Sequence, residues 1–194
     1  MKTYELQDVQ VVSTRANQKT PMAFSTLDKE QIRKLNHGRD IPFLLSLTPS
    51  VTMTSDAGNG IGYTSIKVRG TDPSRINITA NGIPVNDAES SLVFFVNMGD
   101  FMSSVKDVQI QRGVGTSTNG SAAFGATVNM QTDAPSLYPY LNFNASAGSY
   151  ATHKESLRFG SGLLGNHWSF DGRLSNISSN GYIERAASQL NSYF

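Results

Sequence analysis

Three histidines and a few carboxylates are the side chains of this sequence that could carry out catalysis or hold a metal ion. His37, His153 and His167 lie far apart, without the i,i+4 spacing that pairs ligands on one helix face, and cysteine is absent. The carboxylates that could pair as acid and base lie in stretches typical of loops, and they are Asp72, Asp87, Glu89 and Asp100. Loops of most proteins carry such acids, so we expect neither an enzyme nor a metal or cofactor site.

Two arginines are stronger candidates for a functional role, because each ends a run that alternates like a β-strand. The runs are SIKVRG and VKDVQIQRG, in which apolar residues recur at every second position, as in a strand that buries one face. Arg69 precedes Gly70 and Arg112 precedes Gly113, and glycine permits a backbone bend that larger residues resist. We therefore expect both arginines at strand ends, beside sharp turns.

One tight hairpin lies between these two runs. Asn81-Gly82 suits the positive φ angles of such a turn, and segments 75–80 and 83–85 flank it as strands. Residues 99–105, GDFMSSV, then favour a helical turn that leads into the second Arg-Gly run.

Two short helices are expected ahead of the first Arg-Gly run. The first covers residues 27–36, with Ser25-Thr26 as its cap. The second begins at Asp40, with Pro42 in its first turn. It stops before Pro49, and a strand is expected to follow it.

Two loops complete this part of the chain. Residues 55–63, SDAGNGIGY, are rich in glycine but lack the Gly-Lys-Ser/Thr of a phosphate-binding loop, so an exposed loop is expected. The second loop covers residues 86–101, and residues 92–96 are its most apolar part. A bare loop would expose Phe94 and Phe95, so these rings either pack under neighbours or face a ligand, and burial is the favoured interpretation.

From Tyr140 onward the pattern becomes one of regularly alternating strands. YLNFNASAG alternates over nine residues, close to the roughly 9–11 that a tilted strand needs to cross a bilayer. HWSFDGRLSNI repeats the pattern, with Trp168 and Leu174 on one face and Arg173 on the other. THKESLRFGSG between them is a weaker strand on which Arg158 is expected at the surface, and NSYF is a candidate fourth strand. Alternation alone also fits a half-buried sheet of a soluble protein.

Composition excludes several other classes of protein. Sixteen basic and fifteen acidic residues give a net charge of +1, so no long-range field favours nucleic acid. Without cysteine there is no disulfide framework. No apolar run reaches the roughly 18 residues of a spanning helix, and MKTYELQDVQ lacks the apolar core of a signal peptide. If the protein is exported, we expect that its leader was removed or never included.

Four segments, in this order and at these separations, resemble the plug domain of TonB-dependent outer-membrane receptors: SIKVRG, NGIPVND, VKDVQIQRG and NGSAAFGATVNMQT. The resemblance implies an α+β plug domain, with a small mixed sheet and short helices, followed by the first antiparallel strands of a transmembrane β-barrel. It divides the chain into an N-terminal segment (1–20), the plug (21–135) and strands of an incomplete barrel (136–194). Plugged barrels close at about 22 strands, so we expect the N-terminal part of a longer receptor.

The resemblance also assigns roles to particular residues. A TonB box, which adds as a strand to a sheet of the energy-coupling protein, would comprise Asp8, Val9, Gln10, Val11 and Val12. An ordinary edge strand is the alternative for this valine-rich segment. Arg69 and Arg112 would bond to glutamates of the barrel wall and hold the plug in register, the alternative being two exposed arginines. The residues expected to face substrate are Tyr63, Asn86, Phe94 and Phe95.

The function that the resemblance implies is TonB-dependent active uptake of a scarce nutrient, such as an iron-siderophore, haem or cobalamin, across the outer membrane of a Gram-negative bacterium. The expected partners are a TonB-type coupling protein, a small-molecule or metal-chelate substrate and outer-membrane lipid, with no nucleic acid. A soluble or surface β-rich ligand-binding module is the alternative. A β-rich hydrolase is a weaker one.

Overall fold

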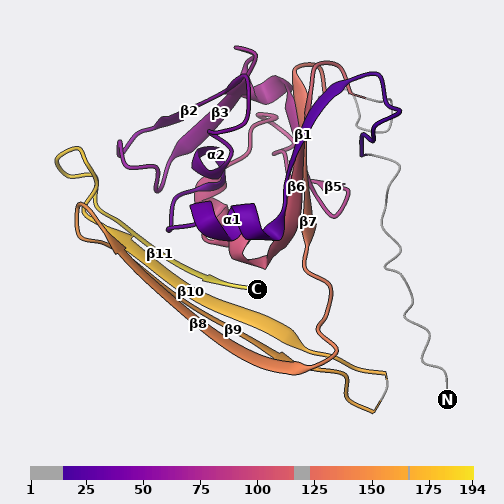
Figure 1. Cartoon of the computed structure of the whole chain (residues 1–194). Helices are drawn as coiled ribbons and strands as arrows, with labels where there is room; N and C mark the ends of the chain where they lie inside the picture. Colours follow the sequence, from indigo (N-terminus) through magenta and orange to yellow (C-terminus); the bar gives the residue numbers. More distant parts are fainter. Residues whose placement is uncertain (1–14, 116–122, 166) are drawn as a thin grey trace.

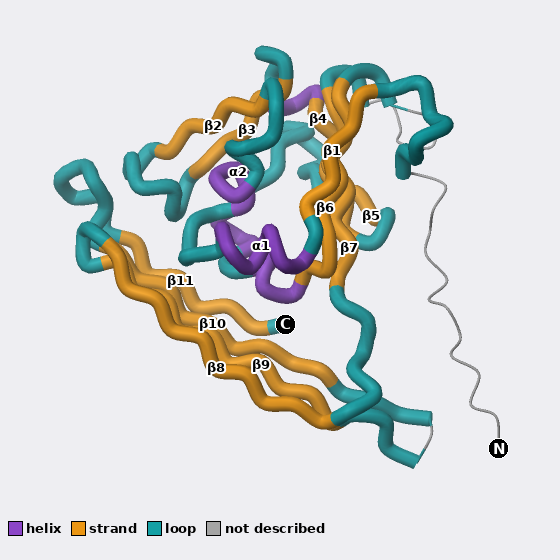
Figure 2. Tube along the Cα trace, viewed as in Figure 1, coloured by secondary structure: helices purple, strands orange, loops and turns teal. Residues whose placement is uncertain are grey.

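The computed structural model describes residues 15–115, 123–165 and 167–194, which form an N-terminal domain (15–135) and a C-terminal sheet (Figure 1). Short helices and β-strands make up the N-terminal domain, and the C-terminal sheet runs beneath it as a separate layer (Figure 2). This arrangement confirms the predicted fold class, an α+β domain followed by antiparallel strands.

A five-stranded mixed sheet forms the centre of the N-terminal domain. Its strands, in spatial order, are β1 (Ala23–Leu27), β6 (Val105–Arg112), β7 (Ala126–Thr132), β4 (Ile76–Ala80) and β5 (Ile83–Pro84). β4 and β7 run parallel, whereas the other neighbours are antiparallel. β4 and β5 form a tight hairpin, and φ is positive at Asn81 and Gly82 within it, as it is at Gly70 and Gly113 after the Arg-Gly arginines.

Two short helices pack beside this sheet: α1 (Lys29–Leu35) contacts β6, and α2 (Ile41–Leu44) contacts a second, smaller sheet (Figure 1). The predicted cap of the first helix is wrong, because Ser25 and Thr26 pair with β6 as part of β1. Asp28 is the N-cap instead, and it forms a capping box with the third residue of the helix. The strand therefore continues almost to the first turn of α1.

The smaller sheet is the antiparallel hairpin of β2 (Val51–Ser55) and β3 (Thr64–Val68). The prediction that its connecting loop is exposed is wrong in part, since four of its residues are buried: Ala57, Gly60, Ile61 and Gly62. The backbone N–H of Asp40 donates to the carbonyl of Gly60 (2.8 Å), which holds the loop against the start of α2. Glycine here permits close packing rather than exposure.

The apolar core lies where the helices meet the two sheets, and its fully buried members include Ile32, Leu44, Ile66, Ile110 and Val128. Among the described residues, three 3-10 segments connect the strands: η2 (Pro73–Arg75), η3 (Phe95–Met98) and η4 (Phe101–Ser104). The last of these is the helical turn predicted ahead of the second Arg-Gly run.

β6 differs from its prediction, because both of its faces are buried. Val108 and Ile110 are fully buried as expected, but Gln109 and Gln111 are also only 5% and 1% exposed. The segment that enters the domain covers Gln109, whose side chain accepts from the backbone N–H of Ala16 (2.7 Å) and donates to its carbonyl (3.0 Å). The amide is thus satisfied by backbone, which is why a polar residue is tolerated there.

The C-terminal sheet has four antiparallel strands in the order β11 (Ser188–Tyr193), β10 (Asp171–Ser179), β9 (Thr152–Ser161) and β8 (Pro139–Gly148). Arg173, on β10, turns toward the N-terminal domain and is 2% exposed, whereas the next residue, Leu174, turns away and is 54% exposed. The two faces therefore divide as the alternation predicted. None of the helices in the described ranges is long and apolar enough to span a membrane.

Replacing Ile110 by Ala should lower the free energy of unfolding of the N-terminal domain by about 2–5 kcal/mol, because it leaves a cavity in the middle of β6. Ile83→Ala, at a position of β5 that is 69% exposed, is the matched control and should change that free energy by under about 0.5 kcal/mol. Hydrogen exchange of the amides in β6 and β7 measures both effects. Equal losses in the two variants would contradict this placement of the core.

Candidate functional site

The two Arg-Gly arginines lie near one another at one end of the N-terminal domain. Arg69 follows β3, and its Nη1 lies 3.3 Å from the position that a Cβ on Gly113 would occupy. Arg112 ends β6 and donates to Oγ of Ser25 (2.7 Å) and to the carbonyl of Phe24 (3.3 Å). Neither guanidinium pairs with a carboxylate in the described part of the chain. Their pairing with glutamates of a barrel wall stays a prediction.

The predicted TonB box, residues 8–12, lies outside the described residues. The segment that follows the box is tied to β6 at two successive positions. Arg15 forms an ion pair with Asp107, and Ala16 exchanges two hydrogen bonds with the side chain of Gln109. A displacement of the chain at Arg15 would therefore act directly on β6.

A groove of about 560 Å³ lies between the β2–β3 hairpin and segment 90–95. The rings of Tyr63 and Phe94 line it and are 64% and 46% exposed. Its charged lining residues, among those described, are Asp56 and Asp72. Exposed aromatic faces beside oxygen acceptors suit a small ligand that stacks and donates hydrogen bonds.

The other two residues expected to face substrate have structural contacts. Phe95 lines the floor of the groove and is only 3% exposed. The side chain of Asn86 accepts from the N–H of Ile78 (2.8 Å) and donates to the carbonyls of Ile76 and Ser91 (2.9 Å each). Asn86 thus braces the loop that carries Phe94. Contact of any of these residues with substrate stays a prediction.

A buried carboxylate, Asp100, joins the N-terminal domain to the C-terminal sheet. It precedes η4 with φ of 51°, and its side chain is fully buried. Lys154 of β9 places Nζ 2.5 Å from Oδ1, and Arg173 of β10 places Nη1 3.4 Å from Oδ2. Ser103 donates to Oδ1 and Ser175 of β10 donates to Oδ2, both at 2.6 Å. Each carboxylate oxygen therefore has a cation and a hydroxyl as partners.

These partners determine the ionisation of Asp100. Burial alone would raise the pKa of its carboxyl, but the charge of Lys154 and the hydrogen bonds from Lys154, Ser103 and Ser175 outweigh it. The pKa of Asp100 is therefore below its ordinary value. The group is a carboxylate at neutral pH, held between two cations of the sheet.

A second acid, Asp133, bonds to the same layer just after β7. Its Oδ2 lies 2.6 Å from Nζ of Lys29 and 2.7 Å from Nη2 of Arg158, so the carboxylate bridges α1 to β9. The prediction that Arg158 is a surface arginine is wrong, since its side chain is 21% exposed and also lies over the ring of Tyr140 at 5.9 Å. Two acids of the N-terminal domain thus face three cations of the sheet.

Sequence reasoning did not find this cluster, although it named Asp100, Arg158 and Arg173. Asp100 was considered only as an acid-base candidate, and Arg173 only as a residue of a polar strand face. The signal that could have indicated the cluster was a run of inward-facing polar residues, Lys154, Ser156 and Arg158, on a strand predicted from two apolar residues. Among the described residues, no group of His, Cys, Asp or Glu side chains could hold a metal ion.

A protein-family comparison identifies a known pattern in this chain. The model of the TonB-dependent Receptor Plug Domain matches residues 16–127. No curated protein sequence matches.

Solved structures share the fold. The alcaligin outer-membrane receptor FauA from Bordetella pertussis has a TM-score of 0.64 at 21% identity, over 90% of this chain and 28% of that one. The pyoverdine outer-membrane receptor FpvA from Pseudomonas aeruginosa PAO1, bound to pyoverdine, has 0.63 at 17% identity, over 84% and 23%. The siderophore receptor PirA from Acinetobacter baumannii has 0.59 at 21% identity, over 81% and 24%. The chain spans about a quarter of the length of each of these structures.

Asp100→Asn should destabilise the contact between the N-terminal domain and the sheet by about 3–5 kcal/mol, because it leaves Lys154 and Arg173 buried without an acid. Faster hydrogen exchange in η4, β9 and β10 measures the loss. Asp56→Asn, at an exposed acid of the β2–β3 loop, is the control and should leave those rates unchanged.

The pH dependence of the same contact is a second readout. Because the folded-state pKa of Asp100 is depressed, its contribution is complete above the ordinary pKa of 3.8 and is lost as pH falls below it. Exchange in β9 and β10 that is equally slow in Asp100→Asn and in the parent at neutral pH would contradict the role of this carboxylate.

Proposed function

The chain belongs to the family of TonB-dependent receptor plug domains, and from that premise we propose that it supplies the plug and first wall strands of an outer-membrane receptor for TonB-dependent active uptake of a scarce nutrient. The N-terminal domain is the plug, and the C-terminal sheet is the start of the barrel wall. The receptor works as a transporter and not as an enzyme.

The observation that carries the proposal is the opposite chemistry of the two faces of the C-terminal sheet. Toward the plug it presents the cations that bind Asp100 and Asp133. On the other face Leu141, Phe143 and Leu174 are 71%, 67% and 54% exposed. A polar inner face and an apolar outer face are what a transmembrane barrel wall requires. A soluble module would expose this apolar surface to water, which disfavours the alternative.

Energy from the coupling protein would enter through the TonB box at residues 8–12, which pairs with that protein as an added strand. The next residues, Arg15 and Ala16, bond to β6, so a pull on the box is delivered to the centre of the plug sheet. Substrate bound at the plug is then released inward as part of the plug moves.

The groove between the β2–β3 hairpin and segment 90–95 is the substrate site of this proposal. Its volume of about 560 Å³ is within the range of small-molecule sites, roughly 300–1,000 Å³. The solved structures named above include receptors for alcaligin and pyoverdine. We propose a metal chelate of the iron-siderophore type, or a similar scarce nutrient such as haem or cobalamin.

Arg69 and Arg112 serve as a further latch to carboxylates of the wall. Arg69→Ala tests this, because Arg69 makes no bond within the described residues whose loss could confuse the result. In receptor made from the full reading frame, Arg69→Ala should accelerate exchange in β3 and β6, and Arg69→Lys should rescue it in part, since the bidentate fork is lost. Exposed Arg33→Ala is the control. Exchange in Arg69→Ala that matches the control would refute the latch.

Membrane fractionation and binding of the coupling protein test the function itself. We expect the full-length product in the outer-membrane fraction, and we expect the purified C-terminal domain of TonB to retain it in a pull-down. Val11→Pro removes a strand hydrogen-bond donor and should reduce that retention at least tenfold, whereas Thr3→Pro, outside the box, should not. A product in the soluble fraction, or equal retention of both variants, would contradict the proposal.

A further inference from the structure

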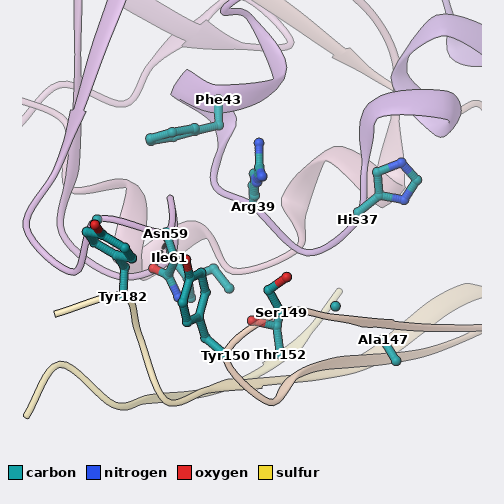
Figure 3. Close-up of a pocket in the computed structure, with 12 residues that line it drawn as sticks. His37, Arg39, Phe43, Asn59, Ile61, Ala147, Ser149, Tyr150, Thr152 and Tyr182 are labelled. Atoms are coloured by element: carbon teal, nitrogen blue, oxygen red, sulfur yellow. Dashed lines mark hydrogen bonds between the residues drawn. The ribbon is translucent and has the colours of Figure 1, made fainter. Parts of the chain in front are cut away.

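A second cavity, which we call the seam pocket, lies between the plug and the C-terminal sheet (Figure 3). It has a volume of about 540 Å³, and its lining includes His37, Arg39, Phe43, Asn59, Tyr150 and Tyr182. The first four belong to the plug, Tyr150 lies in the β8–β9 turn, and Tyr182 lies between β10 and β11. The groove that the proposed function uses shares none of these residues.

The seam pocket contains a guanidinium that has no carboxylate partner among the described residues. Arg39 is exposed and makes no hydrogen bond or ion pair within the described residues; its Cζ lies 5.9 Å from the centroid of the Phe43 ring. Figure 3 shows Arg39 between Phe43 and the β8–β9 turn, with His37 to one side. No acid lines the pocket among the described residues.

The adjacent acid, Asp40, does not neutralise Arg39. Its carboxylate is turned into the plug, where Oδ2 accepts from Oγ1 of Thr64 (2.9 Å), and the residue is 7% exposed. Burial raises the pKa of Asp40 to about 6. The charge that faces the pocket is therefore the cation of Arg39.

The walls of the seam pocket are fixed by contacts between plug and sheet. The N–H of Tyr182 donates to the carbonyl of Ala57 (3.0 Å), and Nδ2 of Asn59 donates to Oγ of Ser179 (2.7 Å). The rings of Tyr150 and Tyr182 meet edge to face with centroids 5.5 Å apart. A site built in this way is preorganised, which lowers the entropy lost on binding.

We propose that the seam pocket binds an anionic oxygen group, a carboxylate or phosphate, of a small soluble ligand. The Arg39 guanidinium supplies a bidentate, charge-assisted contact, and nearby tyrosine, serine and threonine hydroxyls supply further donors. The inference rests on the proposed function, because the anionic group would belong to the transported substrate. The pocket has one wall on the plug and one on the sheet, so the bound group bridges the two.

Equilibrium dialysis of radiolabelled citrate against the detergent-solubilised full-length protein tests the site. Citrate should bind saturably and be displaced by inorganic phosphate but not by uncharged trehalose. Arg39→Gln should weaken citrate binding roughly 10- to 100-fold, the size expected for hydrogen bonds to a charged group. The affinity of Arg39→Lys for citrate should lie between that of the parent and that of Arg39→Gln, because lysine keeps the charge but loses the bidentate fork. Arg33→Gln, at an exposed arginine that does not line the pocket, should bind as the parent does.

Folding and the proposed function are monitored separately. Hydrogen exchange in β3 and β9 should be unchanged in Arg39→Gln, so that weaker binding reports the site and not unfolding. Retention by the TonB domain should also be unchanged, since Arg39 is remote in sequence from the box. If retention holds while citrate fails to bind the parent, or binds Arg39→Gln equally well, the seam site is wrong and the proposed function stands. Displacement by phosphatidylglycerol micelles but not by phosphate would overturn the soluble ligand in favour of a lipid headgroup.

Discussion

The ion cluster at Asp100 is the constraint on which the arrangement of plug and sheet depends. Asp100, Lys154 and Arg173 are each nearly inaccessible to water, so each would be strongly destabilising without the others. The acid comes from the plug and both cations come from the sheet, so neither body can bury its own charges alone. Asp100 has a left-handed backbone conformation at the start of η4, and its side chain contacts Lys154 of β9 and Arg173 of β10. The contact between the two layers is therefore conditional on charge complementarity and not only on apolar burial.

The cluster also fixes the register of the wall strands. Side chains alternate along a strand, so a slip of one residue in β10 would turn Arg173 to the apolar outer face and Leu174 toward Asp100. Nε of Arg173 donates to Oγ of Ser104, and Nη1 donates to Oγ of Ser175 and of Ser192. With Asp100, the guanidinium therefore has four hydrogen-bonding partners. A buried ion pair is weak evidence for net stability, but a mispaired one is costly. The ion cluster therefore selects one register of β9, β10 and β11, because a register shifted by one residue would mispair its charges.

Sequence reasoning predicted the parts of this structure that local patterns specify. Alternation placed Arg173 and Leu174 on opposite faces of a strand, and the Arg-Gly runs ended where β3 and β6 end. It failed where distant segments meet. Gln109 was assigned to a solvent face because no local pattern indicates that Ala16 covers it, and Arg158 was assigned to the surface because Asp133 lies 25 residues away. The polarity of the seam was missed for the same reason. The plug arginines were the expected ionic contacts, whereas the contacts within the described residues use plug acids and wall cations.

The proposed transport function gives this polarity a mechanical consequence. In the proposed function, a pull on the predicted TonB box would reach β6 through Arg15 and Ala16, while η4, which directly precedes β6, is held to the C-terminal sheet through Asp100. The force would therefore act on the short stretch of chain between η4, which Asp100 anchors, and β6, which is pulled. On one side of β6 is β1, an edge strand with one neighbour, and on the other is β7, which is bonded to both β6 and β4. Because β1 pairs with β6 over fewer residues than β7 does and has no second neighbour, the pull would first separate β1 and the N-terminal segment, while η4 and the C-terminal sheet stay in place. In that order of events the wall cluster is the fixed point against which the plug moves.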